Sequence, residues 1–130
     1  MTAAPARGGE RLYPREAQTP CNAGAIGDSA VSCLLMELDT WPKPGLVSRV
    51  DNGSHDDMDA DTFRSSAAAI KPYFQELADA AARGCGMGRL RIIGLEAEAA
   101  MLAATAGVNT HRGAIFGLGL LCAAAIKPYF

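Results

Sequence analysis

The chain has 130 residues, of which 49% are hydrophobic, 20% charged and only 6% aromatic, and its formal net charge is -2. A charge so near zero provides no electrostatic footprint for nucleic acid or an anionic membrane, so we expect neither as a partner. The length fits one domain, and the weighting towards Ala, Leu, Ile and Met favours helices over strands.

The N-terminal stretch differs in character from the rest of the chain. Up to about Pro20 it is rich in Pro, Arg, Gly and Glu and shows no helical periodicity, so we expect residues 1–22 to be a disordered tail. It has no apolar core, which argues against a signal peptide. The 4 cysteines include no Cys-x-x-Cys pair, which favours free thiols over a zinc module. These features predict a cytoplasmic protein.

The first helix is predicted from Ala25 to Trp41, where apolar residues recur every three or four positions and mark one buried face. Asn22 is available as its cap. Two prolines then end the helix, because proline removes an amide donor and disfavours helical geometry in the residue before it. Residues 42–58 are expected to form a loop.

A second helix is predicted to begin near Asp59, with Asp59 or Asp61 as its cap. Pro72 either kinks this helix or opens a new one. The glycine-rich run at 84–88 lacks the Lys-Ser/Thr of a phosphate-binding loop and follows no strand. We therefore interpret it as a linker that ends a helix.

Two further helices are predicted, one over residues 90–106 and one from about Arg112, in which small residues allow close contact between helices. The most apolar run, residues 114–126, is too short to span a bilayer, so no membrane partner is expected. No strand pattern competes with these assignments. The predicted fold is an all-α, multi-helix array of about four or five helices, with the active loops gathered at one end.

One repeat is unusual. The segment from Ala67 to Phe74 recurs without change from Ala123 to Phe130. Architectural repeats recur over about 20 to 50 residues and diverge, so this one has another origin. Our hypothesis is that a template switch at the shared Ala-Ala-Ala truncated a longer protein. Residues 23–130 would then be a helical domain that is incomplete at its C-terminus. Sequencing the source DNA tests this, and a clean stop after Phe130 in independent reads would contradict it.

Four ordered blocks carry a family resemblance. They are Pro-Lys-Pro-Gly-Leu-Val from Pro42, Asn-Gly-x-His-x-Asp-Met from Asn52, Gly-Leu-Glu-x-Glu-x-x-Met from Gly94 and Gly-Val-Asn-Thr-His-Arg-Gly-Ala-Ile-Phe from Gly107. Together they resemble the triphosphoribosyl-dephospho-CoA synthases, which build the prosthetic-group precursor of citrate lyase and malonate decarboxylase. The resemblance implies a transferase with ATP and 3'-dephospho-CoA as substrates. The triphosphoribosyl group of ATP would pass to a ribose 2'-hydroxyl, and adenine would leave.

Such a displacement needs a base near the attacking hydroxyl and a proton or hydrogen bond for the leaving nitrogen. Asp57 is the candidate base, because it lies in the His-x-Asp-Met block. His111 is the candidate acid or hydrogen-bond donor to adenine, since its ordinary pKa of about 6.5 permits either state. Glu98 shares a helix face with Met101 that leads into the last block, so it is the candidate orienting carboxylate.

Mg²⁺ is the expected cofactor, held largely through the phosphates of ATP with help from carboxylates. The candidate metal ligands are His55, Asp57 and Glu98. Cations, turn residues and the start of a helix are suited to nucleotide phosphates. The candidate nucleotide-binding residues are Lys43, Gly45, Arg49, Asn109, Thr110 and Arg112.

Plain structural roles are open alternatives for several of these positions. Asp56 and Asp59 could solvate or cap a helix start, Gly45 could serve a turn, Asn109 could be a cap, and Arg49 could be a solvated charge. Two other functions also stay open. One is a magnesium-dependent hydrolase of a nucleotide or N-glycosidic bond, which would release product without dephospho-CoA. The other is an inactive helical fragment that self-associates through exposed apolar surface.

Overall fold

A computed structural model of the chain describes residues 22–126. Over that range it contains four helices and no strand, which confirms the all-α prediction. The tail expected over residues 1–22 lies outside the described range except for Asn22, and so does the end of the repeated segment. The helices are α1 (Ala23–Asp39), α2 (Ala60–Ala82), α3 (Met87–Ala104) and α4 (Arg112–Ala125).

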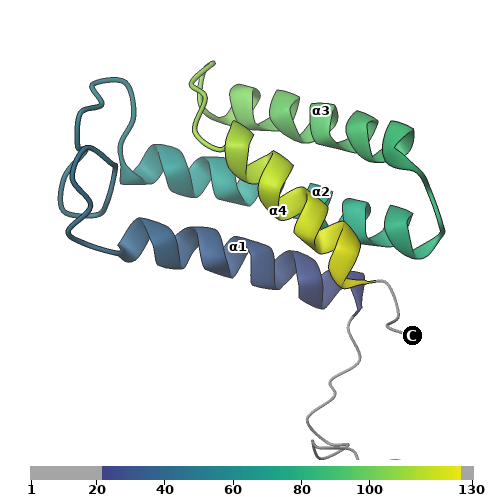
Figure 1. The fold of residues 1–130 in the computed structure, drawn as a ribbon. Coiled ribbons are helices and arrows are strands. Elements are labelled where there is room, and N and C mark those ends of the chain that lie inside the picture. The colour runs from purple at the N-terminus through teal and green to yellow at the C-terminus, as the bar shows by residue number, and fades with distance from the viewer. Residues whose placement is uncertain (1–21, 127–130) are drawn as a thin grey trace, which may run out of the picture.

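Successive helices run in opposite directions, so their connections fall at two ends of the array (Figure 1). α2 is central and packs against each of the other three helices. The two longer connections, residues 40–59 and 105–111, both lie at the left-hand end in Figure 1. The ends of α1 and α3 and the beginnings of α2 and α4 meet there. We call this the loop end of the array, and it is where the sequence predicted the active loops to gather.

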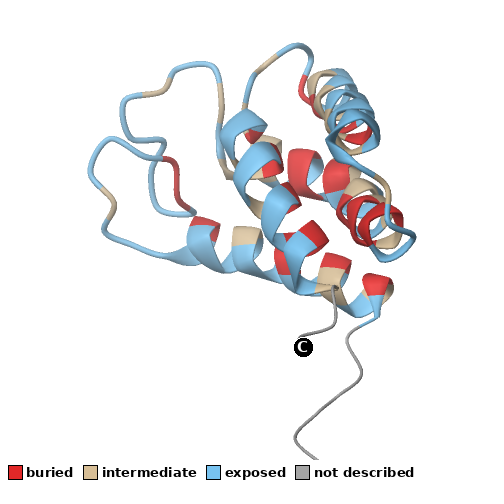
Figure 2. Ribbon diagram, turned by 45° about the vertical axis from the view of Figure 1, so that its right-hand side comes forward, coloured by how far each residue is buried: buried red, intermediate tan, exposed pale blue. Residues whose placement is uncertain are grey.

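The hydrophobic core lies between α2 and its neighbours, and the buried residues of the helices face one another there (Figure 2). Ile70 and Phe74 of α2 and Ile93 and Met101 of α3 are almost wholly excluded from solvent. A Cβ added at Gly119 of α4 would come within 2.9 Å of a side-chain carbon of α2, so this glycine permits a close approach of the two helices. None of the described helices combines the length and apolar character needed to cross a membrane.

The beginnings of α1 and α2 are set by local hydrogen bonds, as the sequence predicted. The side chain of Asn22 accepts a hydrogen bond from the Ala25 amide at 2.7 Å. For α2 the cap is Asp59 rather than Asp61. The Thr62 amide donates to the Asp59 carboxylate at 2.9 Å, and the Asp59 amide donates to the Thr62 hydroxyl at 3.2 Å. The hydrogen bonds from Thr62 lower the pKa of Asp59.

Pro72 and the glycine-rich run at 84–88 were both expected to affect where helices end, and the structure decides each case. α2 runs without interruption through Pro72, so the alternative in which this proline opens a new helix is wrong. The glycine run is a linker between helices, as interpreted from the sequence. Gly84 has φ +80°, in the left-handed region, and its amide donates to the Ala81 carbonyl at 3.0 Å. A glycine at this position ends a helix without steric cost.

Candidate functional site

The loop between α1 and α2 is held in shape by two glycines. Gly53 has φ +61°, and a Cβ there would come within 2.4 Å of the Gly45 carbonyl carbon. Gly45 has φ +81°, and its carbonyl oxygen accepts hydrogen bonds from the amide and the hydroxyl of Ser54 at 3.2 and 3.0 Å. The two turns of the loop therefore pack backbone against backbone, and Gly45 serves this packing. Its predicted contact with nucleotide stays a prediction.

The two cations of this loop are both paired in the structure. Lys43 reaches back to the end of α1, where its Nζ lies 2.8 Å from Glu37 Oε1 and 2.6 Å from the Glu37 carbonyl oxygen. Its side chain is only 10% exposed. A cation at this place complements the negative end of the helix. Arg49 instead makes an exposed surface pair with Asp39 at 3.0 Å, which fits the solvated-charge alternative.

His111 is buried between α2 and the beginning of α4, with only 7% of its surface exposed. Its Nδ1 lies 2.7 Å from the Ser66 hydroxyl, which in turn accepts a hydrogen bond from the Thr110 hydroxyl at 2.6 Å. The ring also packs edge-on against Phe63, with centroids 5.0 Å apart. The loop end thus brings together two predicted residues, His111 and Thr110, and two that the sequence reasoning missed.

The spacing of Phe63 and Ser66 in the sequence could have indicated that they share a buried helix face. Phe63, Ser66 and Ile70 are spaced by three and four positions, so they lie on one face of α2. A serine among apolar residues on a buried face needs a hydrogen-bond partner, because an unpaired buried hydroxyl is costly. The spacing could therefore have identified Ser66 as part of a polar cluster, although not which residue it binds.

Burial lowers the pKa of His111 below its ordinary value of 6.5, and the nearby Glu37 carboxylate opposes this only in part. The imidazole is therefore neutral at neutral pH. Glu37 also holds the ammonium group of Lys43, so it connects the two polar clusters at the loop end.

The neutral His111 predicts a loss of stability in mild acid. Because its pKa is lower in the folded chain than in the unfolded chain, the unfolded chain takes up this proton first as the pH falls. The contribution to stability is thus complete above about pH 6.5 and is lost as the pH falls from there towards the folded pKa. We expect the free energy of urea unfolding to decrease between pH 7.5 and pH 5.5.

Single-histidine variants test this pH dependence. The chain has 2 histidines, so His55→Ala is a matched control that should retain the decrease, whereas His111→Asn should lose most of it. The comparison uses the change with pH within each variant, so a constant destabilisation by either substitution does not matter. An equal decrease in His111→Asn and in the unaltered chain would contradict the assignment.

Asp57 and His55 lie together just before α2, with 4.0 Å between His55 Nδ1 and Asp57 Oδ1. The Asp57 side chain is 64% exposed and the His55 side chain is 38% exposed, so both reach solvent. Among residues 22–126, no three His, Cys, Asp or Glu side chains gather in a way that could hold a metal ion. The predicted set of His55, Asp57 and Glu98 is therefore not one preformed site. Mg²⁺ commonly binds one or two carboxylates together with substrate phosphates, and the exposed Asp57 fits that chemistry.

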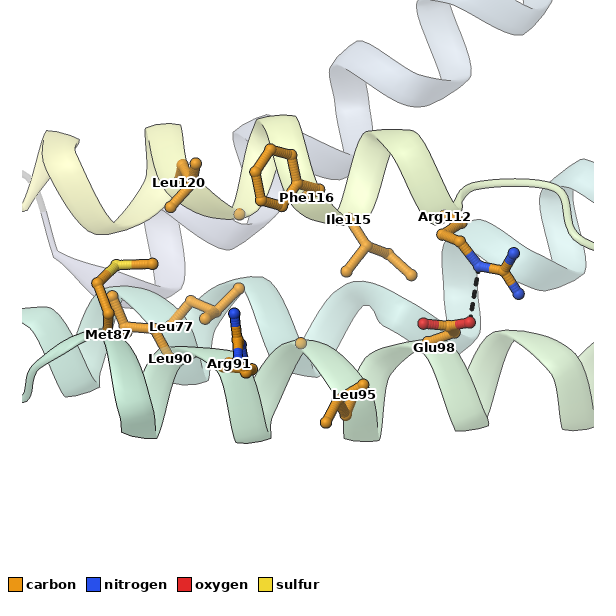
Figure 3. A pocket seen from close by; sticks show the side chains of 12 residues that line it. Leu77, Met87, Leu90, Arg91, Leu95, Glu98, Arg112, Ile115, Phe116 and Leu120 are labelled. Carbon is orange, nitrogen blue, oxygen red and sulfur yellow. Dashed lines mark hydrogen bonds and ion pairs between the residues drawn. The ribbon is translucent and has the colours of Figure 1, made fainter.

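Glu98 pairs with Arg112, which the sequence reasoning did not predict. Glu98 Oε1 accepts a hydrogen bond from Arg112 Nε at 2.7 Å (Figure 3). The other guanidinium nitrogens point away from the carboxylate in this view. The N-cap residue of α4 is His111, whose side chain makes no capping bond, but the Asn109 side chain accepts a hydrogen bond from the Arg112 amide at 3.1 Å. Asn109 therefore satisfies the first amide of the helix from two positions before the cap, close to the capping role that was one of its alternatives. The ion pair between Glu98 and Arg112 therefore links the sequence block that begins at Gly94 to the block that begins at Gly107.

An apolar groove of about 260 Å³ extends from this ion pair between α3 and α4 (Figure 3). Phe116 on its rim is 70% exposed. Exposed apolar side chains gathered in one groove are typical of binding surfaces. The large apolar residues that line it are Leu77, Met87, Leu90, Leu95, Ile115, Phe116 and Leu120.

Comparison with known proteins extends these observations. The family model of ATP:dephospho-CoA triphosphoribosyl transferase matches residues 23–128. A probable 2-(5''-triphosphoribosyl)-3'-dephosphocoenzyme-A synthase of Albidiferax ferrireducens is 48% identical over 107 residues, which are 78% of this chain and 35% of the relative. The synthase of Pectobacterium atrosepticum is 46% identical over 106 residues, 77% of this chain and 35% of the relative.

A third relative, the probable synthase of Pseudomonas fluorescens, is 48% identical over 119 residues, which are 87% of this chain and 41% of the relative. The chain therefore spans only about a third to two fifths of the length of these relatives. No solved structure matches it.

Proposed function

The chain belongs to the ATP:dephospho-CoA triphosphoribosyl transferase family, and we propose that it contributes reacting groups for transfer of the triphosphoribosyl group of ATP to 3'-dephospho-CoA. The observation that carries the proposal is the convergence at the loop end. Lys43 contacts Glu37 at the end of α1, and His111 contacts Ser66 near the beginning of α2. Blocks far apart in the sequence thus present a cation and a neutral imidazole at the same end of the array.

In this reaction the ribose 2'-oxygen of dephospho-CoA bonds to the anomeric carbon of ATP, and the bond from that carbon to adenine breaks. Asp57 is the proposed base for the hydroxyl proton, because its carboxylate is exposed and lies 4.0 Å from the imidazole of His55 rather than in a tight ion pair. His111 is the proposed partner of the leaving adenine. The positive charge that develops on the sugar is favoured by a nearby carboxylate.

The triphosphate needs cations, and Lys43 and Arg112 are the strongest candidates. Lys43 uses two of its three ammonium hydrogens on Glu37, and Arg112 uses Nε on Glu98. The beginning of α4 adds backbone amides that favour an anion. Mg²⁺, when bound through the phosphates, would neutralise part of their charge. Of the two predicted carboxylate ligands, Asp57 is more exposed than Glu98, so it is the better able to contribute a ligand.

Adenine release tests the proposal. With ATP, Mg²⁺ and dephospho-CoA, the purified chain should release adenine, and Asp57→Asn should slow release by about a hundredfold or more while helix content is unchanged. Asp56→Asn is the matched control, since Asp56 is also exposed and lies one position away, and its rate should stay within about twofold of the unaltered chain.

Three other outcomes of the adenine-release assay would change this interpretation. Unaltered rates in Asp57→Asn would remove Asp57 from the role of base. Release that does not need dephospho-CoA would favour the hydrolase alternative. No release from a folded chain would contradict the expected result that this chain carries out the transfer by itself.

The groove between α3 and α4 supports a second candidate, association of two copies through their exposed apolar side chains without catalysis. Phe116 of one copy is the side chain best placed to enter the groove of another, because it is the most exposed of the large apolar side chains that line it. Sedimentation velocity over a range of concentrations tests this. A sedimentation coefficient that does not change with concentration would exclude it.

The use of the product is also part of the proposal. We propose that it serves as prosthetic-group precursor for citrate lyase or malonate decarboxylase, in the cytoplasm. Complementation of a strain that lacks its own synthase, scored for growth on citrate and on malonate, would distinguish the two enzymes. Cell fractionation would test the location.

A further inference from the structure

Ser66 has no part in the reaction described above, yet it is wholly buried and bonded to His111. It is 0% exposed, and its hydroxyl lies 2.7 Å from His111 Nδ1 and 2.6 Å from the Thr110 hydroxyl. An unpaired buried hydroxyl would cost about 1–3 kcal/mol, so the burial of Ser66 depends on these two contacts.

The direction of this hydrogen-bond chain decides the tautomer of His111, because hydroxyl hydrogens can point either way. With Thr110 Oγ1 as the donor to Ser66 Oγ, the single hydroxyl hydrogen of Ser66 is left for His111 Nδ1, its remaining partner within residues 22–126. A nitrogen that accepts a hydrogen bond carries no proton, so in this arrangement the proton of the neutral ring lies on Nε2.

The second ring nitrogen is available to a ligand. In the part of the chain that the structure describes, Nε2 makes no hydrogen bond to another residue, and no enclosed side-chain nitrogen or oxygen lacks a partner. Nε2 is therefore not sealed in the core. With Nδ1 on Ser66, Nε2 is the ring nitrogen that His111 has left for a ligand.

We propose that Ser66 is a positioning residue that holds His111 as the neutral Nε2–H tautomer, so that the imidazole gives the leaving adenine a hydrogen bond rather than a proton. Thr110 orients Ser66 in turn. The role towards adenine rests on the proposed function, whereas the tautomer is a property of the folded chain alone.

The tautomer can be measured directly by ¹⁵N NMR of the histidine rings in the labelled chain at neutral pH. We expect His111 to show an unprotonated Nδ1 and a protonated Nε2. Ser66→Ala should produce a mixture of the two tautomers, and Ser66→Thr, which keeps the hydroxyl, should restore the single form. The half-buried His55, which does not contact Ser66, is an internal control that should be unaffected in both variants. A proton on Nδ1 in the unaltered chain would overturn the proposal, even if Ser66→Ala fails to fold.

Adenine release provides the functional readout. Ser66→Ala should lower kcat by about tenfold or more with little change in the KM for ATP, because the ring is misoriented while the phosphate contacts stay in place. An Nε2–H tautomer in a chain that never releases adenine would refute the proposed function and leave the tautomer assignment standing. A normal kcat in Ser66→Ala would refute the positioning role alone.

Discussion

Gly53→Ala is expected to disrupt the loop between α1 and α2 and to weaken the binding of ATP by about tenfold or more, while the four helices stay formed. A Cβ at this position would lie 2.4 Å from the Gly45 carbonyl carbon, 2.5 Å from the Leu46 nitrogen and 2.6 Å from the Gly45 oxygen. All three are backbone atoms, so no side chain can rotate to make room. The left-handed φ of +61° adds about 1–2 kcal/mol of strain for any residue with a Cβ.

The consequence for ATP follows from what the loop carries. The turn at Gly45 comes directly after Lys43, and the turn at Gly53 comes directly before His55 and Asp57. Separating the two turns would move a proposed phosphate contact and the proposed base relative to each other. We expect the affinity for ATP, measured by calorimetry, to fall by about tenfold or more. Circular dichroism should show unchanged helix content.

Gly117→Ala is the matched control for this substitution. Gly117 lies inside α4, and an added Cβ would meet no atom within 4 Å. Alanine in a helix interior is favoured over glycine by about 0.5–1 kcal/mol, so this variant should be slightly more stable and should bind ATP as the unaltered chain does. If Gly53→Ala bound ATP with unchanged affinity, the loop shape would not be required for the site.

Phe74→Ala is expected to lower the free energy of unfolding by about 3–5 kcal/mol. Phe74 is 1% exposed and lies on α2, the helix that packs against all three others. Removal of the ring leaves a cavity in the shared core, which the surrounding helices can fill only in part. Since small domains are commonly stable by about 5–15 kcal/mol, the variant could lose most of its folded population at moderate temperature.

Urea unfolding followed by circular dichroism measures this loss. Phe116→Ala is the control, because the same ring is removed from a side chain that is 70% exposed. Its effect should stay within about 1 kcal/mol. Equal losses at the two positions would show that the centre of the core does not lie at Phe74.

Much of the fold could be predicted because helix boundaries depend on neighbouring residues. Asn22 and Asp59 each bond to an amide three positions along the chain, and such spacings are visible in a sequence. The first helix was expected to extend to Trp41, but α1 ends at Asp39 and Trp41 lies exposed beyond it. Periodicity marks a face but does not fix the residue at which the helix ends.

The sequence by itself determined the all-α class, the places where the helices begin and end, and the blocks by which the family is known. Only the tertiary structure decided which polar groups meet. Ser66 and His111 are 45 positions apart, and Glu98 and Arg112 are 14 apart. Such contacts depend on how far each helix is shifted and rotated against its neighbour, and these displacements are set by side-chain packing across the whole core. Local spacing therefore predicted the candidate residues, and packing decided their partners.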